Sequence, residues 1–261
     1  MSFESFVDII QRQVLTFVSP AEWEDPFESY LFKAVKNDEG TKKVMRILKE
    51  ITPKYAQANM EILKRFEFCI KGQCWTNTGE SDALWRIYSN NKMAIRIEVE
   101  EDKINRLNNV TINEVKYSNK LSLEAELQQM RVADTLDVRK AFCSKRSAFK
   151  HENEVRLLSG INVDAVLSDS IKMQKLSLEQ LKKDGKINET QYTHILTKVI
   201  NYQGEPKLNK TISFEHIDGF IKSVMLHPSA PKWFEDTLKF FCETHKLNYV
   251  GKSKLYELQF D

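Results

Sequence analysis

KHENEVRLL, residues 150–158, is the most informative stretch of the sequence. A group of charged side chains runs directly into an apolar tail. Alternation along a strand places Glu152, Glu154 and Arg156 on one face and directs the intervening apolar residues into the core. The sequence therefore predicts a core strand that carries two carboxylates one residue apart.

Two interpretations of this charged face stay open. In the first, the face is solvated and Glu154 pairs with Arg156 or Lys145. In the second, a rigid strand holds Glu152 and Glu154 at the edge of a cleft, with His151 and Arg156 as supporting residues. A carboxylate pair can also bind Mg²⁺, although a nuclease would need further carboxylates from elsewhere in the chain.

The rest of the chain has the composition of a globular protein. It has 261 residues, a net charge of +2 and 41% hydrophobic residues, which fits one domain over residues 1–261 with a substantial core. The balanced charge does not indicate nucleic-acid binding, although a local basic patch stays open. The four cysteines lack CxxC spacing, the histidines are scattered, and no apolar run is long enough to span a bilayer. We therefore expect a reduced, cytoplasmic protein with no metal site and no membrane partner.

Hydrophobic periodicity divides the chain into helices and strands. Alternating patterns predict strands over residues 14–20, 66–75, 93–100, 111–118, 154–158, 194–202, 220–228 and within 247–258. Helical spacing predicts helices over residues 3–10, 44–51, 55–66, 81–89, 121–148 and 229–246. These elements predict an α+β fold in which a mixed central sheet packs against several helices. The segment 165–210 is interpreted as a peripheral insertion.

A second motif is WEDPFE, residues 23–28. The favoured interpretation is a packed turn in which Trp23 and Phe27 are anchors and Glu28 opens a helix. The alternative is a gate or support beside a pocket, with Trp23, Asp25 and Glu28 at its edge.

A third motif is CWTNTGESDALWRIYS, residues 74–89. A strand end, a polar loop with a single glycine and a helix start with Ser81 as N-cap follow one another, which is an arrangement that binds phosphates or nucleotides. Trp75 and Tyr88 are expected to border one concave pocket for a planar ligand. Tyr88 and Trp85 lie three residues apart on one helix face, so a role in the core stays open as well.

These motifs together resemble one family. WEDPFE, then CWT with ESDALWRIY and AIR, then KRxxFKHExEVRL stand in the order typical of the bacterial family of domains of unknown function numbered 2971. The resemblance covers residues 17–158, with a looser match over 220–255. It implies no particular reaction, but it implies a setting in bacterial phage defence or among toxins.

The same order of elements is distantly similar to the ADP-ribosyltransferase superfamily. That resemblance implies an enzyme with an ADP-ribosyltransferase-like core that uses NAD as a substrate and modifies a macromolecular acceptor. It implies that Ser81 and Tyr88 line the nicotinamide side of the pocket, beside Trp75. It also implies that Glu154 is catalytic and holds the ribose 2′-hydroxyl, while Glu152 orients the acceptor. A fixed carboxylate suits this chemistry because positive charge develops at the ribose.

Two other functions stay open. One is a non-enzymatic defence or sensor module that binds a nucleotide or a protein, and the other is a metal-dependent nuclease that uses Glu152 and Glu154. The transferase hypothesis makes a geometric prediction. The strand EVRLL must pair with FEFCIKGQCW or MAIRIEVE, so that Ser81, Tyr88 and the two glutamates surround one cleft.

Overall fold

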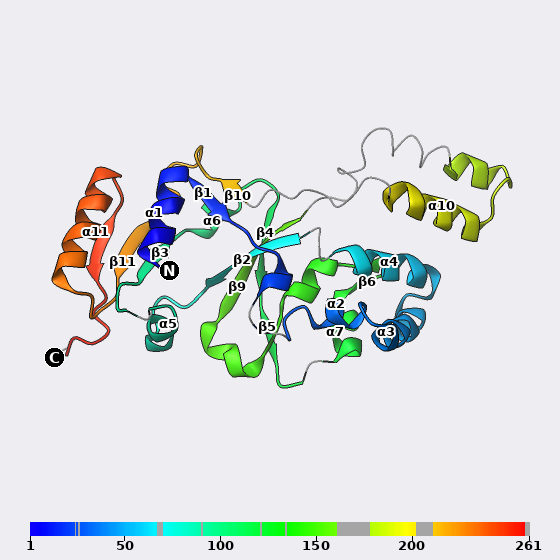
Figure 1. The fold of residues 1–261 in the computed structure, drawn as a ribbon, viewed down its shortest axis with the longest axis horizontal. Helices are drawn as coiled ribbons and strands as arrows, with labels where there is room; N and C mark the ends of the chain where they lie inside the picture. The colour runs from blue at the N-terminus through cyan, green and yellow to red at the C-terminus, as the bar shows by residue number, and fades with distance from the viewer. Residues whose placement is uncertain are drawn as a thin grey trace.

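The structure, a computed structural model, describes residues 1–23, 25, 27–66, 70–89, 91–120, 122–133, 135–160, 178–201 and 211–258 (Figure 1). The strands are β1 (Val14–Thr16), β2 (Ile70–Thr76), β3 (Ile95–Glu98), β4 (Val110–Glu114), β5 (Lys116–Ser118), β6 (Arg131–Val132), β7 (Thr135–Leu136), β8 (Ser144–Arg146), β9 (Glu154–Gly160), β10 (Thr211–Ser213), β11 (Ser223–Leu226) and β12 (Tyr249–Lys252). The helices are α1 (Phe3–Arg12), α2 (Tyr30–Ala34), α3 (Asp38–Ile51), α4 (Ala56–Phe66), α5 (Asp82–Ile87), α6 (Glu101–Ile104), α7 (Leu123–Met130), α10 (Glu189–Asn201) and α11 (Lys232–Thr244), with 3-10 helices η1 (Pro20–Glu22), η2 (Pro53–Tyr55), η3 (Val138–Phe142) and η4 (Ser147–Glu152).

Strand β9 is the middle of a three-stranded antiparallel sheet, between β2 and β4. Neighbouring residues of a strand point to opposite faces, and here both faces are covered. Leu157 belongs to one hydrophobic core and Leu158 to another. The EVRLL strand predicted from the sequence is therefore a core strand, and it pairs with the strand that contains IKGQCW.

Elements from near both ends of the chain contribute to the first core. Strands β12, β11 and β3 form a second three-stranded sheet, in which β11 runs parallel to β12 and antiparallel to β3. Helices α1 and α11 cover it, and Phe3 meets Phe234 edge to face with ring centroids 5.4 Å apart. The N-terminal and C-terminal helices consequently lie side by side (Figure 1).

The second core is mainly helical. Helices α2, α3, α4 and α7 pack with η3, and Phe32 stacks on Phe142 with ring centroids 4.6 Å apart. Helix α3 begins where the Asn37 side chain accepts a hydrogen bond from Gly40 N, at 2.7 Å. Gly40 lies so close to the carbonyl of Ala34 that a Cβ atom has no room there. This packing fixes how α2 meets α3.

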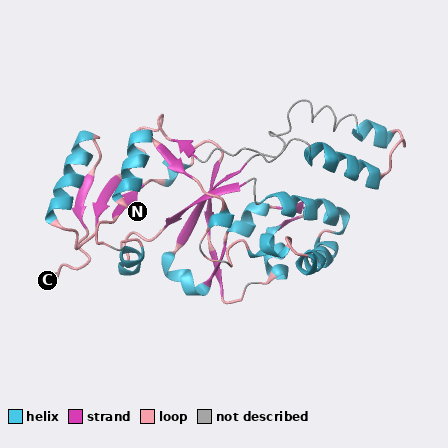
Figure 2. Ribbon diagram, viewed as in Figure 1, coloured by secondary structure: helices cyan, strands magenta, loops and turns pink. Residues whose placement is uncertain are grey.

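The predicted α+β class is confirmed: helices pack against several small sheets (Figure 2). In the described part of the chain, no helix has both the length and the apolar character needed to cross a membrane. The proposed insertion at 165–210 lies outside the described residues except for 178–201. Of that segment the structure gives α10, which Figure 1 draws apart from the sheets.

The long helix predicted over residues 121–148 is wrong. Helix α7 ends at Met130, because Arg131 is extended and Ala133 has a positive φ of 52°. The chain then forms the β6–β7 pair, η3 and β8. The polar pattern resembled a helix surface, but Phe142 in this segment is buried in the second core.

The strand predicted over residues 194–202 is also wrong, because residues 194–201 belong to α10; residue 202 lies outside the described residues. A signal for the helix is present in the sequence. Asn188 and Gln191 cap the helix reciprocally: each backbone N–H donates to the other residue's side chain, at 3.0 and 2.9 Å. This arrangement is a capping box, and it outweighs the preference of the β-branched residues that follow for strands.

Candidate functional site

Pairing of β2 with β9 brings the third motif to the charged stretch. In the register, Thr76 lies opposite Glu154 and Cys74 opposite Arg156. The Thr76 hydroxyl donates to the carbonyl of Glu152 at 2.6 Å. The polar loop that leads to α5 therefore starts beside the two glutamates.

Glu152 does not lie on the strand, contrary to the prediction. It ends the 3-10 helix η4, and Asn153 adopts the left-handed conformation with φ 42° before β9 begins at Glu154. Alternation therefore cannot set the direction of Glu152. The two glutamates meet because Lys145 binds both side chains.

Five charged side chains form a buried charge cluster, made of Glu28, Lys145, Glu152, Glu154 and Arg156. Lys145 Nζ lies 2.6 Å from Glu152, 2.9 Å from Glu154 and 3.2 Å from Glu28. Arg156 donates to both carboxylate oxygens of Glu154, at 2.7 and 3.1 Å, and pairs with Glu28 at 2.9 Å. Three carboxylates face two cations, so the charge cluster carries one excess negative charge when all five groups are ionised.

The charge cluster controls the ionisation of its members. Burial alone would raise the pKa of Glu154, but its hydrogen bonds and charge interaction with Arg156, together with Cys74 and Lys145, lower that pKa to about 2. Burial raises the pKa of Glu28 despite its contacts with Arg156 and Lys145. Glu154 is therefore the anion that the surroundings stabilise most clearly at neutral pH.

Two residues of the WEDPFE motif, Trp23 and Glu28, contact Arg156 of this charge cluster. The Trp23 ring lies 4.1 Å from the Arg156 guanidinium carbon, and Glu28 enters the cluster itself. Asp25 accepts two hydrogen bonds from Arg146, at 3.0 and 3.2 Å, and the Arg146 guanidinium also lies over Phe27. Glu28 does not open a helix as predicted, because α2 begins at Tyr30 with Ser29 in the N-cap position.

A cavity of about 560 Å³ opens beside the charge cluster, within the ~300–1,000 Å³ typical of small-molecule pockets. Its lining includes the predicted site residues Trp75, Ser81, Tyr88, Glu152 and Glu154. Its lining comes from Met1, the end of β2 with its loop, α5 with Tyr88, β3 with its flanking residues, the end of η4 and the start of β9. The structure thus gathers these five residues around one space.

The other predicted site residues lie elsewhere. Four of them do not line the cavity: Trp23, Asp25, Glu28 and Arg156. Glu28 and Arg156 belong to the charge cluster, in which Glu152 and Glu154 are the members that line the cavity. His151 is exposed on η4 and does not line the cavity. In the part of the chain that the structure describes, no three His, Cys, Asp or Glu side chains gather in a way that could hold a metal ion.

Sequence reasoning missed two groups at this site. Arg96 of β3 lines the cavity and supplies a positive charge there, paired with Glu98 at 3.1 Å. The Tyr117 hydroxyl accepts the backbone N–H of Glu154 at 2.8 Å. The alternation of Arg96 with apolar neighbours showed which face it occupies, but nothing in the sequence showed that this face borders a cavity.

Comparison with known proteins gives one match. Residues 84–157 match the family model described as Protein of unknown function (DUF2971). The matched segment runs from within α5 through the Glu154–Arg156 pair, so it includes Lys145 of the charge cluster and the cavity residues Tyr88, Arg96, Glu152 and Glu154. No curated protein and no solved structure matches the chain. The similarity to ADP-ribosyltransferases has no support from these comparisons, and it enters below as a proposal.

Proposed function

We propose that the cavity binds NAD and that the protein is an ADP-ribosyltransferase-like enzyme. The observation that carries the proposal is that Trp75, Ser81, Tyr88, Glu152 and Glu154 line one cavity. Aromatic walls suit a planar nicotinamide or purine ring, because stacking holds such a ring at little entropic cost. Arg96 offers a cation for the pyrophosphate in the same space.

The reaction follows from the charges. The bond between C1′ of the ribose and the nicotinamide nitrogen breaks, and its electron pair leaves with nicotinamide. Positive charge develops on the ribose, and the fixed anion of Glu154 stabilises it without solvent reorganisation. An acceptor nucleophile then bonds to C1′ and releases its proton. Glu152 lies beside Glu154 on the cavity wall, where it can orient that acceptor.

A specific observation favours a second candidate, a non-enzymatic module that binds a nucleotide. Both carboxylate oxygens of Glu154 already accept hydrogen bonds from Arg156, and one also accepts from Lys145. A carboxylate held in this way can act purely as structural support. The same cavity would then sense a nucleotide without transforming it.

The metal-dependent nuclease is the third proposal. Lys145 Nζ lies within 2.9 Å of both Glu152 and Glu154, where a metal ion shared by the pair would lie. A cation that is already in place makes Mg²⁺ binding less favourable, so this function ranks below the other two.

Incubation of the purified protein with NAD separates the three proposals. Nicotinamide release is followed by chromatography in EDTA and, in parallel, in Mg²⁺; calorimetry records NAD binding. Equal release in both buffers supports glycosyl transfer, since that chemistry needs no metal. Binding without release supports the sensor module. Cleavage of a DNA or RNA substrate in Mg²⁺ alone, without nicotinamide release, overturns the transferase.

A further inference from the structure

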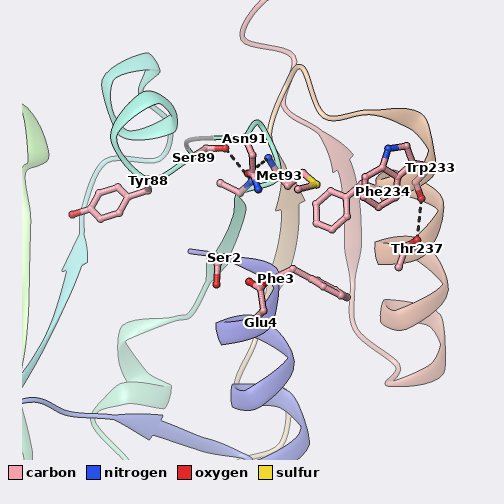
Figure 3. Close-up of a pocket in the computed structure, with 11 residues that line it drawn as sticks. Ser2, Phe3, Glu4, Tyr88, Ser89, Asn91, Met93, Trp233, Phe234 and Thr237 are labelled. Carbon is pink, nitrogen blue, oxygen red and sulfur yellow. Dashed lines mark hydrogen bonds between the residues drawn. The ribbon is translucent and has the colours of Figure 1, made fainter.

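A second cavity lies next to the first. It has a volume of about 360 Å³ and is lined by residues from α1, from the segment between α5 and β3, and from α11 (Figure 3). Tyr88 and Ala94 belong to the lining of both cavities. In Figure 3 the Tyr88 ring points away from α11, so its backbone lies at the boundary between the two spaces.

The walls of this second cavity are aromatic and thioether groups. Phe3, Met93 and Phe234 contribute apolar surface, and Trp233 stands at the rim with 62% of its surface exposed. Trp233 contacts Phe234 with ring centroids 5.6 Å apart. A large exposed indole beside a concave apolar surface is suited to stacking on a planar ring.

The polar groups at the rim show which ring fits. The Asn91 side-chain oxygen accepts from the backbone of Met93 at 3.1 Å, which directs the amide so that its NH₂ group is the donor left for a ligand. Glu4 lies on the same lining and is exposed, and hydrogen bonds from its own backbone and from Ser2 lower the pKa of its carboxyl. One donor and one anionic acceptor match adenine, whose ring nitrogens accept and whose amino group donates.

We infer that the second cavity is the adenine subsite of a dinucleotide whose nicotinamide half occupies the first cavity. The inference rests on the proposed function for the identity of the ligand. Tyr88 and Ala94 line both cavities, so the two spaces adjoin at these residues, and it is there that the inferred dinucleotide crosses from one to the other. Trp233 stacks on the purine, Glu4 accepts from its amino group, and Asn91 donates to a ring nitrogen.

Calorimetric titration with AMP and with nicotinamide mononucleotide, each alone, tests the subsite. Trp233→Leu is expected to weaken AMP binding about tenfold, the loss of one base–aromatic stack, and to leave nicotinamide mononucleotide binding unchanged. Phe240→Leu is the matched control, because Phe240 is an aromatic residue of the same helix, is 72% exposed and lines neither cavity. Equal AMP affinity in the wild type and Trp233→Leu, or equal loss in both variants, overturns the inference.

A second variant tests the contact with the amino group. Glu4→Gln is expected to abolish a preference for AMP over IMP, since IMP carries a carbonyl oxygen where adenine carries the amino group. An unchanged preference overturns the role of Glu4. The subsite and the proposed reaction can be overturned separately. If AMP binding depends on Trp233 but no nicotinamide is released from NAD, the subsite is supported and the transferase is overturned. Nicotinamide release with an unchanged KM in Trp233→Leu supports the transferase and overturns the subsite.

Discussion

Arg156 and Glu154 form a bidentate ion pair inside the three-stranded sheet. Their side chains are two residues apart on β9, and two N–H groups of the guanidinium donate to the two carboxylate oxygens, at 2.7 and 3.1 Å. Arg156 is completely buried, and its Nη1 group donates to the carbonyl of Phe142 at 2.6 Å. This pair ties the cavity wall to the helical core, so it affects both stability and the proposed chemistry.

Removal of one partner of this pair is expected to be costly. Arg156→Met removes one of the two cations that pair with Glu154 and Glu28 and leaves both carboxylates buried with Lys145. We expect it to lower the free energy of unfolding by about 3–5 kcal/mol. The exposed pair Arg12–Asp8, at 3.2 Å, is the control, because Arg12→Met there should cost less than about 1 kcal/mol. Urea unfolding measures both. A loss in Arg156→Met as small as in Arg12→Met would show that the buried pair contributes little.

Activity should depend on the charge of Glu154. Glu154→Gln is expected to lower kcat for nicotinamide release by about 10²–10³, because the amide cannot offset the positive charge that develops on the ribose. Glu243→Gln makes the same change at an exposed position of α11 and should leave kcat unchanged. Circular dichroism at the assay temperature verifies that each variant is folded. Full turnover in folded Glu154→Gln would remove Glu154 from the mechanism.

Acidic pH should lower the free energy of unfolding, because Glu154 becomes protonated. The pKa of Glu154 lies at about 2 in the folded protein, below the ordinary value of 4.5. The stabilisation is therefore fully present above pH 4.5 and is lost as the pH falls from there through about 2, by about 3 kcal/mol in total. Unfolding free energies of the wild type and Glu154→Gln, measured between pH 5 and 2, should converge. Parallel curves would contradict the depressed pKa.

Glu126 should have the opposite pH dependence. It is buried on α7, its Oε2 atom has no hydrogen-bond partner among the residues that the structure describes, and burial raises its pKa from 4.5 to about 7. Folding then disfavours ionisation, so stability should fall as the pH rises from 4.5 through 7, by up to about 3 kcal/mol. Glu126→Gln should remove this decline between pH 5 and 8, whereas Glu124→Gln, exposed on the same helix, should keep it. If stability still declines between pH 5 and 8 in Glu126→Gln, other groups cause the decline.

The packing of the Trp23 ring over Arg156 should be sensitive to one methyl group added at Gly72. A Cβ atom on Gly72 would lie 2.8 Å from the Trp23 ring, which in turn lies over Arg156. Gly72→Ala is expected to displace that ring and to cost about 1–3 kcal/mol, as overpacking does. Gly79→Ala meets nothing within 4 Å and should be nearly neutral. Thermal unfolding of the two variants provides the test, and equal melting temperatures would mean that Trp23 yields without cost.

Local pattern was sufficient for several elements. Three predicted elements correspond to observed ones: the strand FEFCIKGQCW to β2, which begins at Ile70, the helix after Ser81 to α5, and the strand EVRLL to β9. Each combines a clear period with a turn or cap at its end, and this local information is independent of the rest of the chain. The prediction for the segment after α7 was wrong because the polar residues of that segment suit both a helix surface and short strands. Only burial of Phe142 in the second core distinguishes them.

The sequence alone determined that Glu152, Glu154 and Arg156 stand near one core strand, and it left open whether they are solvated. The tertiary structure decided that question. Charged residues at alternate positions are compatible with a solvated edge and with a buried ion cluster, and the difference depends on what covers them. Here Trp23 and Glu28 reach the pair from a segment far away in the sequence, while Lys145 reaches it from β8, the strand that precedes β9 in the chain. Burial and long-range pairing are properties of the packed chain, so no local pattern encodes them.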